Sequence, residues 1–154
     1  MNGLMPRMWR MLLVCFSLTA CNSLLTKDPP APVYDVRSAT VVADPTISPQ
    51  LLSAVTQRVN AAIAATTRPS PMPQVSLNIR IASVEKAQGI QQDRNVAKVN
   101  IDATSIESGS VIGIASFETT TIAPDPAGVD EMMAEDIAAR VRSTFALNTP
   151  PLGS

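Results

Sequence analysis

The stretch Val75-Ser76-Leu77-Asn78-Ile79-Arg80-Ile81 places an aliphatic side chain at every second position and a polar one between. Successive side chains of a β-strand point to opposite faces of a sheet, so this alternation predicts a strand with one buried face and one face in water. A second alternation follows over residues 97–103, with apolar Ala97, Val99, Ile101 and Ala103. We expect the two strands to pair antiparallel through a polar loop over residues 88–95.

The segment before these strands predicts a strand and then a helix. Residues 33–42 are rich in β-branched side chains and end before Asp44-Pro45, which indicates a first strand. Ser48-Pro49 suits the N-cap and first turn of a helix, which we expect over residues 49–65. Prolines 69, 71 and 73 rule out its continuation. The residues that line one face at helical spacing are Leu52, Val55, Val59, Ala62 and Ile63.

The segment after them predicts a fourth strand and a second helix. A turn at Glu107-Ser108-Gly109-Ser110 leads into a β-branched run over residues 111–121. The last helix has two possible starts, Asp125-Pro126 or Asp130, and its apolar residues Met133, Ile137, Val141 and Phe145 recur every four positions. The order βαβββα predicts an α+β fold with two layers, in which both helices cover one face of a four-stranded, mainly antiparallel sheet.

A short leader precedes this domain. Arg7 and Arg10 stand before an apolar run over residues 11–20, which is well short of the roughly 20 residues that a spanning helix needs. The run ends in Leu18-Thr19-Ala20-Cys21, which resembles the lipobox of bacterial lipoproteins at every position. The resemblance implies cleavage between Ala20 and Cys21, a diacylglyceryl thioether on Cys21, and an acyl chain such as palmitate on the freed amine. The alternative is an ordinary secretory leader that leaves Cys21 as a free thiol.

The lipid would decide where the protein works. Two or three acyl chains hold a protein on a membrane for as long as it functions. In lipoproteins of enteric bacteria an aspartate after the cysteine favours the inner membrane, and this chain has Asn22, so we expect the outer membrane and its periplasmic face. The predicted organisation is a signal peptide (1–20), a proline-rich tether of at most about 35 Å (21–32), one α+β domain (33–147) and a flexible tail (148–154).

Composition excludes several classes of function. Loss of Arg7 and Arg10 with the leader leaves 10 basic and 13 acidic residues, which gives no indication of nucleic-acid binding. The chain has no histidine, so it lacks the usual general base, the commonest metal ligand and any Ser-His-Asp triad. Cys15 leaves with the leader and Cys21 would carry lipid. We therefore expect no catalytic residue, no metal site and no cofactor.

Three weaker patterns have structural explanations beside functional ones. Glu131 and Glu135 lie one turn apart and could share a cation or act as an acid/base pair, but acidic residues at a helix start are usually a solvated face that matches the helix dipole. Lys86 or Lys98 could form a Ser-Lys dyad only with a geometry that the sequence does not supply. Of Met132 and Met133, the second has helical spacing and is expected in the core.

The fourth predicted strand offers a candidate interaction surface. Val111, Ala115 and Phe117 fall on one face and Ile112 and Ile114 on the other, so either arrangement leaves aliphatic side chains on the open face of the sheet. The alternative is that this strand is central and buried on both faces. The residues that we expect to form an interaction face are Arg80, Asn100, Ile112 and Ile114.

The segment from Val99-Asn100-Ile101-Asp102 through Glu107-Ser108-Gly109-Ser110-Val111-Ile112 resembles the strand, acidic residue, Ser-Gly turn and strand of domains in the penicillin-binding-protein activators and the curli secretion lipoprotein. The resemblance covers about the central half of the domain, and implies a module that docks onto envelope partners. The sequence therefore predicts a non-enzymatic envelope lipoprotein that is an accessory or protein-interaction module. The alternative is a binding module for a small apolar or lipid-like ligand, held between helices and sheet.

Overall fold

The computed structural model describes residues 34–68, 71–90 and 92–149, so the expectations for the leader, Cys21 and the tether lie outside the described residues. The predicted α+β fold is confirmed. All described elements belong to the unit Ala31–Ser154. In chain order they are β1 (Asp35–Ala43), α1 (Pro49–Ala64), β2 (Gln74–Gln88), β3 (Arg94–Ser105), β4 (Val111–Ile122), the 3₁₀ turn η2 (Pro126–Gly128) and α2 (Val129–Phe145).

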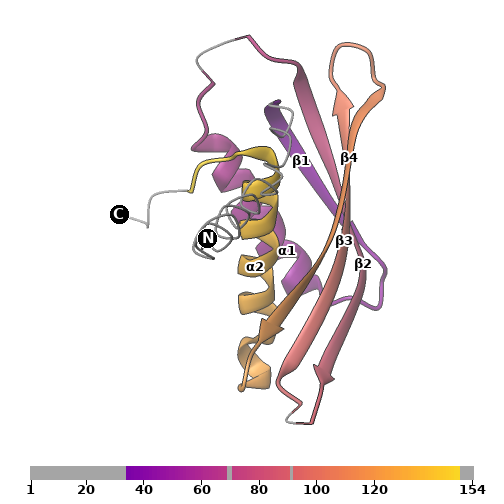
Figure 1. Ribbon diagram of the computed structural model, residues 1–154, viewed down its shortest axis with the longest axis vertical. Helices are drawn as coiled ribbons and strands as arrows, with labels where there is room; N and C mark the ends of the chain where they lie inside the picture. Colours follow the sequence, from indigo (N-terminus) through magenta and orange to yellow (C-terminus); the bar gives the residue numbers. More distant parts are fainter. Residues whose placement is uncertain (1–33, 69–70, 91, 150–154) are drawn as a thin grey trace, which may run out of the picture. The chain divides into compact units, whose positions relative to one another are not determined.

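The four strands form one sheet in the order β1-β2-β3-β4. β1 pairs parallel with β2, while β2–β3 and β3–β4 are antiparallel, so the sheet is mixed. Figure 1 shows both helices against the same face of the sheet, with the opposite face open. We call these the inner face and the outer face.

The core lies between the helices and the inner face. The alternating side chains of the opening stretch, Val75, Leu77, Ile79 and Ile81, are essentially inaccessible to solvent, as are Val99 and Ile101 on β3. They pack in one cluster with the helices. On α1 the expected residues Val55, Val59 and Ala62 are buried, whereas Leu52 and Ile63 are only partly buried, and Leu51, which was not expected there, is fully buried. On α2 all four expected residues, Met133, Ile137, Val141 and Phe145, are buried.

Of the two expected starts of the last helix, Asp125-Pro126 opens a 3₁₀ turn, whereas Asp130 lies within the first turn of α2, whose N-cap is Gly128. Asp125 caps the 3₁₀ turn by accepting a hydrogen bond of 3.0 Å from the backbone N–H of Ala127, and α2 itself begins at Val129. Ser48 does occupy the N-cap of α1, but its hydroxyl donates to Oε1 of Gln50 at 2.8 Å and not to the helix backbone. The position was predicted correctly and the capping bond is absent.

The end of α2 is joined to the segment that follows α1. Ala146 adopts the left-handed conformation, with φ 51° and ψ 41°, and ends the helix. Arg68 donates from Nη2 to the carbonyls of Phe145 and Ala146, both at 2.9 Å. A cation at this position satisfies carbonyls that the helix leaves free and opposes the negative end of its dipole.

Candidate interaction surface

The strand register places Arg80, Asn100 and Ile114 on the outer face, while Ile112 has no register partner on β3. Arg80 on β2 lies opposite Asn100 on β3, which lies opposite Ser116 on β4. In the next row Asp102 lies opposite Ile114. Arg80, Asn100, Ile112 and Ile114 are all exposed. The structure therefore brings the predicted residues onto one surface, spread over three neighbouring strands.

β4 is an edge strand, so the alternative that it is central and buried on both faces is wrong. Local alternation shows that a strand has two faces but does not show what lies beside it, and the order of strands depends on long-range pairing. The edge that β4 leaves unpaired extends over 12 residues, among which Glu118 is the only charged side chain. Proteins usually protect such edges with lysine, proline or very short strands.

A β-bulge at the start of β4 changes its faces. Gly113 pairs with Ala103 and Val111 with Thr104, which leaves Ile112 as the extra residue. The expectation that Val111 shares a face with Ala115 and Phe117 is therefore wrong. Those two side chains pack against the core, whereas Val111 is 52% exposed. The bulge shifts the alternation by one residue, and hydrophobic periodicity gave no sign of this insertion.

The result is a group of exposed β-branched side chains, which we call the β4 patch: Val111, Ile112 and Ile114. Their exposed fractions are 52%, 42% and 80%. Single exposed apolar residues are common on protein surfaces, but adjacent ones on an unpaired edge strand indicate an interaction surface. The patch is the strongest candidate for a functional surface in the part of the chain that the structure describes.

Tyr34 supports the bulge from the inner face, and the sequence did not reveal this contact. Its hydroxyl donates to the carbonyl of Ile112 at 3.3 Å. A Cβ at Gly113 would lie 3.0 Å from the Tyr34 hydroxyl oxygen, so the absence of a side chain there leaves room for the ring. A glycine inside a strand often marks such a close approach, and this was the available signal.

Glu131 and Glu135 share a cation, but that cation is a side chain of the protein. Arg58 on α1 pairs with Glu131 and, through Nε at 3.0 Å, with Glu135 on α2. Arg142 also pairs with Glu135, at 2.7 Å. The hydrogen bond from Arg142 lowers the pKa of Glu135, whereas burial raises it. Because Arg58 lowers it as well, the pKa lies below the ordinary value. Glu135 therefore stays ionised, and the two carboxylates join the two helices through Arg58, as a structural ion-pair network does.

The two lysines considered for a Ser-Lys dyad both pair with carboxylates. Lys98 lies 4.0 Å from Glu118 across the outer face. Lys86 lies 2.6 Å from Oδ1 of Asp130. Burial raises the pKa of Asp130, but the hydrogen bond and the positive charge of Lys86 outweigh this effect and hold the pKa below the ordinary value. Lys86 is therefore held in an ion pair with Asp130.

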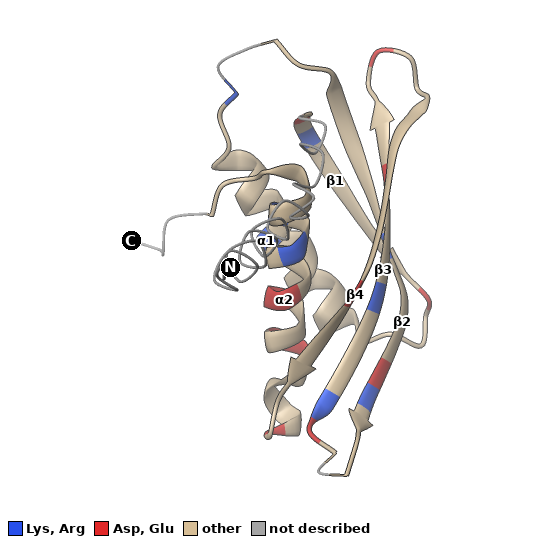
Figure 2. Cartoon of the chain, viewed as in Figure 1, with Lys and Arg blue, Asp and Glu red and all other residues tan. Residues whose placement is uncertain are grey.

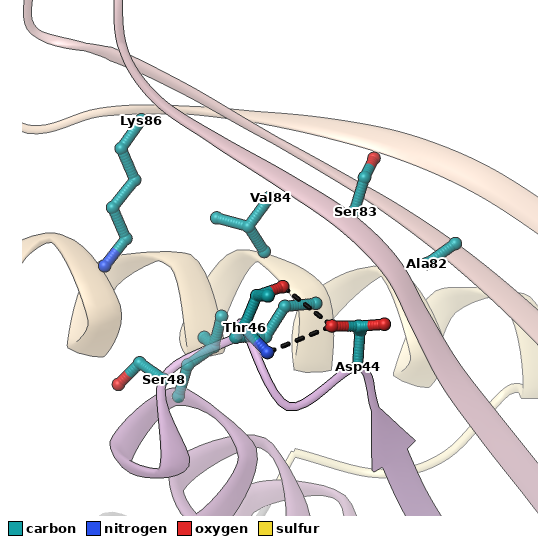
Figure 3. Close-up of a pocket in the computed structure, with 9 residues that line it drawn as sticks. Asp44, Thr46, Ser48, Ala82, Ser83, Val84 and Lys86 are labelled. Carbon is teal, nitrogen blue, oxygen red and sulfur yellow. Dashed lines mark hydrogen bonds between the residues drawn. The ribbon is translucent and has the colours of Figure 1, made fainter.

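A pocket of about 630 Å³ opens beside this ion pair, between the β1–α1 connection and β2 (Figure 3). Polar side chains from several segments line it, including Asp44, Ser48, Ser83 and Lys86. Asp44 accepts hydrogen bonds from the backbone N–H (3.0 Å) and hydroxyl (2.9 Å) of Thr46, which lower its pKa. The carboxylate therefore holds the turn into α1.

The described residues contain no group of three or more acidic, histidine or cysteine side chains placed to hold a metal ion. Within the same ranges, no helix is both long and apolar enough to cross a membrane.

Comparison with known proteins gives similarity at the level of the fold. No protein-family model and no curated protein sequence matches the chain. Two crystal forms of the PelC dodecamer from Paraburkholderia phytofirmans are 16% and 15% identical to it, with TM-scores of 0.49 and 0.48. They cover 74% and 75% of this chain, and 89% of their own chain in each case.

Two further solved structures are similar over comparable lengths. One is a protein from Caulobacter crescentus described as a candidate lipoprotein, with 16% identity, a TM-score of 0.44, and coverage of 70% of this chain and 87% of that chain. The other is a Xanthomonas campestris protein of the family DUF330, with 12% identity, a TM-score of 0.45, and coverage of 76% and 86%. At these values no residue role or activity transfers to this chain.

Proposed function

We propose that this chain is a lipid-anchored protein of the bacterial cell envelope that binds an envelope protein through the β4 patch and the neighbouring outer face. The observation that carries the proposal is the exposure of Val111, Ile112 and Ile114 on an unpaired edge strand. A partner that covered this surface would remove apolar area from water and could add a strand to the free edge. Arg80 and Asn100 would supply polar contacts beside the apolar group.

The anchor is the second part of the proposal. Cys21 closes Leu18-Thr19-Ala20-Cys21, and its acyl chains would hold the domain at the outer membrane, facing the periplasm. The tether over residues 21–32 would let the domain meet a partner embedded in or bound to that membrane.

The role proposed is that of an accessory or interaction module, without catalysis. The carboxylates and lysines considered as candidates form ion pairs or hold turns, as described above. A histidine is absent from the whole chain. Arg80, Asn100, Ile112 and Ile114 are exposed and combine apolar with polar side chains, which suits contact with a protein surface.

The alternative, a module that holds a small apolar ligand between helices and sheet, has less support. Side chains of Leu77, Ile79, Ile101, Met133 and Ile137 fill that layer and are essentially inaccessible. The pocket beside Lys86 includes the charged side chains of Asp44 and Lys86, which do not suit an apolar ligand.

The partner surface can be tested by affinity capture from detergent-solubilised envelopes. We expect Ile114→Asp to reduce recovery of the partner about tenfold or more, because it places a charge in the apolar contact. Thr120→Asp is the matched control, since Thr120 is also exposed on the outer face of β4 but outside the patch. Equal recovery by the wild type and both variants, or a wild-type protein recovered alone, would contradict the proposed surface.

The anchor can be tested separately by Cys21→Ser and membrane fractionation. We expect the wild type in the membrane fraction and the variant in the soluble fraction, because the variant has no thiol to lipidate. A variant that stays with the membrane would show that something other than lipid on Cys21 holds the protein there.

A further inference from the structure

One end of the sheet combines the attachment point of the tether with a turn that carries exposed isoleucine and valine. Asp35 at the start of β1 pairs with Gln74 at the start of β2, and Val75 pairs with Ser105 at the end of β3. The β3–β4 turn therefore lies at the same end as Tyr34, the first described residue (Figure 1). We call this the tether end, defined by Tyr34, Gln74 and residues 105–111.

Chain length limits how the domain can face a membrane. From Cys21 to Tyr34 the chain can reach at most about 43–47 Å. Val75 to Gln88 of β2 run beside Ser105 to Arg94 of β3, so the sheet is about 40 Å long, and the β2–β3 loop is the part of the domain farthest from the point where the tether enters. An anchor on Cys21 therefore favours an orientation in which the tether end is next to the lipid.

The β3–β4 turn is a defined structure that presents apolar side chains at this end. Ile106 is 52% exposed, and its backbone N–H donates to the carbonyl of Gln74 at 3.0 Å. The turn closes with hydrogen bonds from Gly109 to Ser105 at 2.9 Å and from Ser105 to Ser110 at 2.8 Å. Gly109 adopts φ +70°, which suits glycine. Ile106 and Val111 are therefore held in place by the turn that exposes them.

The distribution of charge indicates which surface this end fits. Figure 2 shows charged positions along the whole length of the sheet. At the tether end Asp35 and Arg37 of β1 lie 3.6 Å apart and offset each other, and Glu107 is the charge within the β3–β4 turn. A carboxylate beside the exposed isoleucine disfavours anionic lipid, whose surface potential is negative. A zwitterionic lipid surface accepts apolar side chains without that repulsion.

We propose that Ile106 and Val111 enter the lipid surface beside the anchor, so that the domain rests on a zwitterionic membrane by its tether end. This inference rests on the proposed lipid on Cys21. The acyl chains hold the protein at the membrane, and the turn supplies a second contact that fixes its orientation. Of the β4 patch, Val111 then faces the lipid, while Ile112 and Ile114 remain available to a protein partner together with the rest of the outer face.

Tryptophan fluorescence can test this orientation directly. Trp9 is the only tryptophan of the chain and leaves with the predicted leader, so an introduced tryptophan is a unique probe in the mature protein. The lipidated, full mature chain with Ile106→Trp would be reconstituted in phosphatidylcholine vesicles with brominated acyl chains. The matched control is Ile90→Trp, because Ile90 is a fully exposed isoleucine in the loop at the opposite end. Val111→Trp is a second probe of the tether end if Ile106→Trp does not fold.

We expect brominated lipid to quench the emission of Ile106→Trp at least about twofold and to leave that of Ile90→Trp unchanged, because quenching requires contact with the acyl chains. Vesicle-bound protein without quenching at either tether-end probe, or with quenching at Ile90→Trp, would overturn the orientation while leaving the anchor intact. Wild-type protein that does not float with the vesicles would instead contradict the lipid on Cys21, and the inference with it.

Discussion

At the scale of single residues, the contact between Tyr34 and Gly113 links the first described residue to the bulge in β4. A Cβ added at Gly113 would lie 3.0 Å from the hydroxyl oxygen of Tyr34. The same hydroxyl donates to the carbonyl of Ile112. The two residues should therefore behave as a coupled pair when they are substituted.

We expect Gly113→Ala to lower the free energy of unfolding by more in the wild type than in a Tyr34→Phe background. The coupling between the two substitutions should be about 1 kcal/mol. In the first case the new methyl group meets the hydroxyl oxygen at 3.0 Å, and in the second only the ring carbons remain close, at 3.4 Å, which is an ordinary van der Waals contact. A double-mutant cycle measured by urea unfolding would determine the coupling. The same effect of Gly113→Ala in both backgrounds would show that the ring moves aside without cost.

Ala146 gives a second prediction, because it ends α2 in the left-handed region at φ 51°. Ala146→Gly should increase the free energy of unfolding by about 0.5–1 kcal/mol, since glycine adopts this conformation without strain from a Cβ. Ala139→Gly is the matched control inside the same helix and should cost about 1 kcal/mol. Loss of stability in both variants would show that Ala146 is not strained. Thermal or urea unfolding would measure either change.

At the scale of elements, the pairing of α1 with α2 depends on charge as well as on apolar contact. Arg58 joins the helices through Glu131 and Glu135, and the pKa of Glu135 is lower than the ordinary 4.5. A carboxyl group whose pKa is lowered by folding contributes stability in full above its unfolded pKa. That contribution is lost as the pH falls through the folded value.

We therefore expect the free energy of unfolding to decrease below about pH 4.5, and Arg58→Met to weaken this dependence. At pH 7 the substitution should cost about 0.5–1 kcal/mol, because both carboxylates are more than half exposed and solvent screens the pairs. Arg140→Met is the control, since Arg140 is exposed on α2 and has no ion pair with a described residue. Urea unfolding at pH 7 and at pH 3.5 would measure how much the free energy of unfolding changes with pH in each variant. An unchanged pH dependence in Arg58→Met would contradict the role of this network.

Local periodicity predicted which segments form strands and helices far better than it predicted which segments lie beside one another. The alternation over Val75–Ile81 and the four-residue spacing on α2 are local signals, and the structure bears out both. The bulge at Ile112 and the edge position of β4 depend on pairing with β3, which no spacing within β4 reports. The candidate face was predicted because Arg80, Asn100 and Ile114 follow from alternation alone. The contact with Tyr34 spans 78 residues and could not be predicted in this way.

At the scale of the whole molecule, the C-terminal boundary of the domain can be tested by truncation. Leu147 is buried, and Asn148 donates to the hydroxyl of Thr66 at 2.8 Å and to the carbonyl of Ala65 at 3.0 Å. We expect a mature chain that ends at residue 149 to unfold at the same urea concentration as one that ends at Ser154. A chain that ends at Ala146 should lose about 2–3 kcal/mol, through the missing leucine side chain and hydrogen bonds.

The outcome would also refine the predicted domain of residues 33–147. If the chain that ends at residue 149 is destabilised, residues 150–154 contribute to the fold. If the chain that ends at Ala146 is as stable as the full mature chain, the contacts of Leu147 and Asn148 contribute nothing measurable.

The parallel pairing of β1 with β2 has a consequence for the order in which the sheet can assemble. β2, β3 and β4 follow one another through short connections, so their pairing needs only local loop closure and can be fast. β1 is made first during synthesis, yet its partner β2 arrives only after α1 and the segment that follows it. A chain made from its N-terminus would therefore hold β1 unpaired until the β2–β3–β4 meander had formed. The first strand of the chain would be the last to enter the sheet, and its docking would be the slow step of folding.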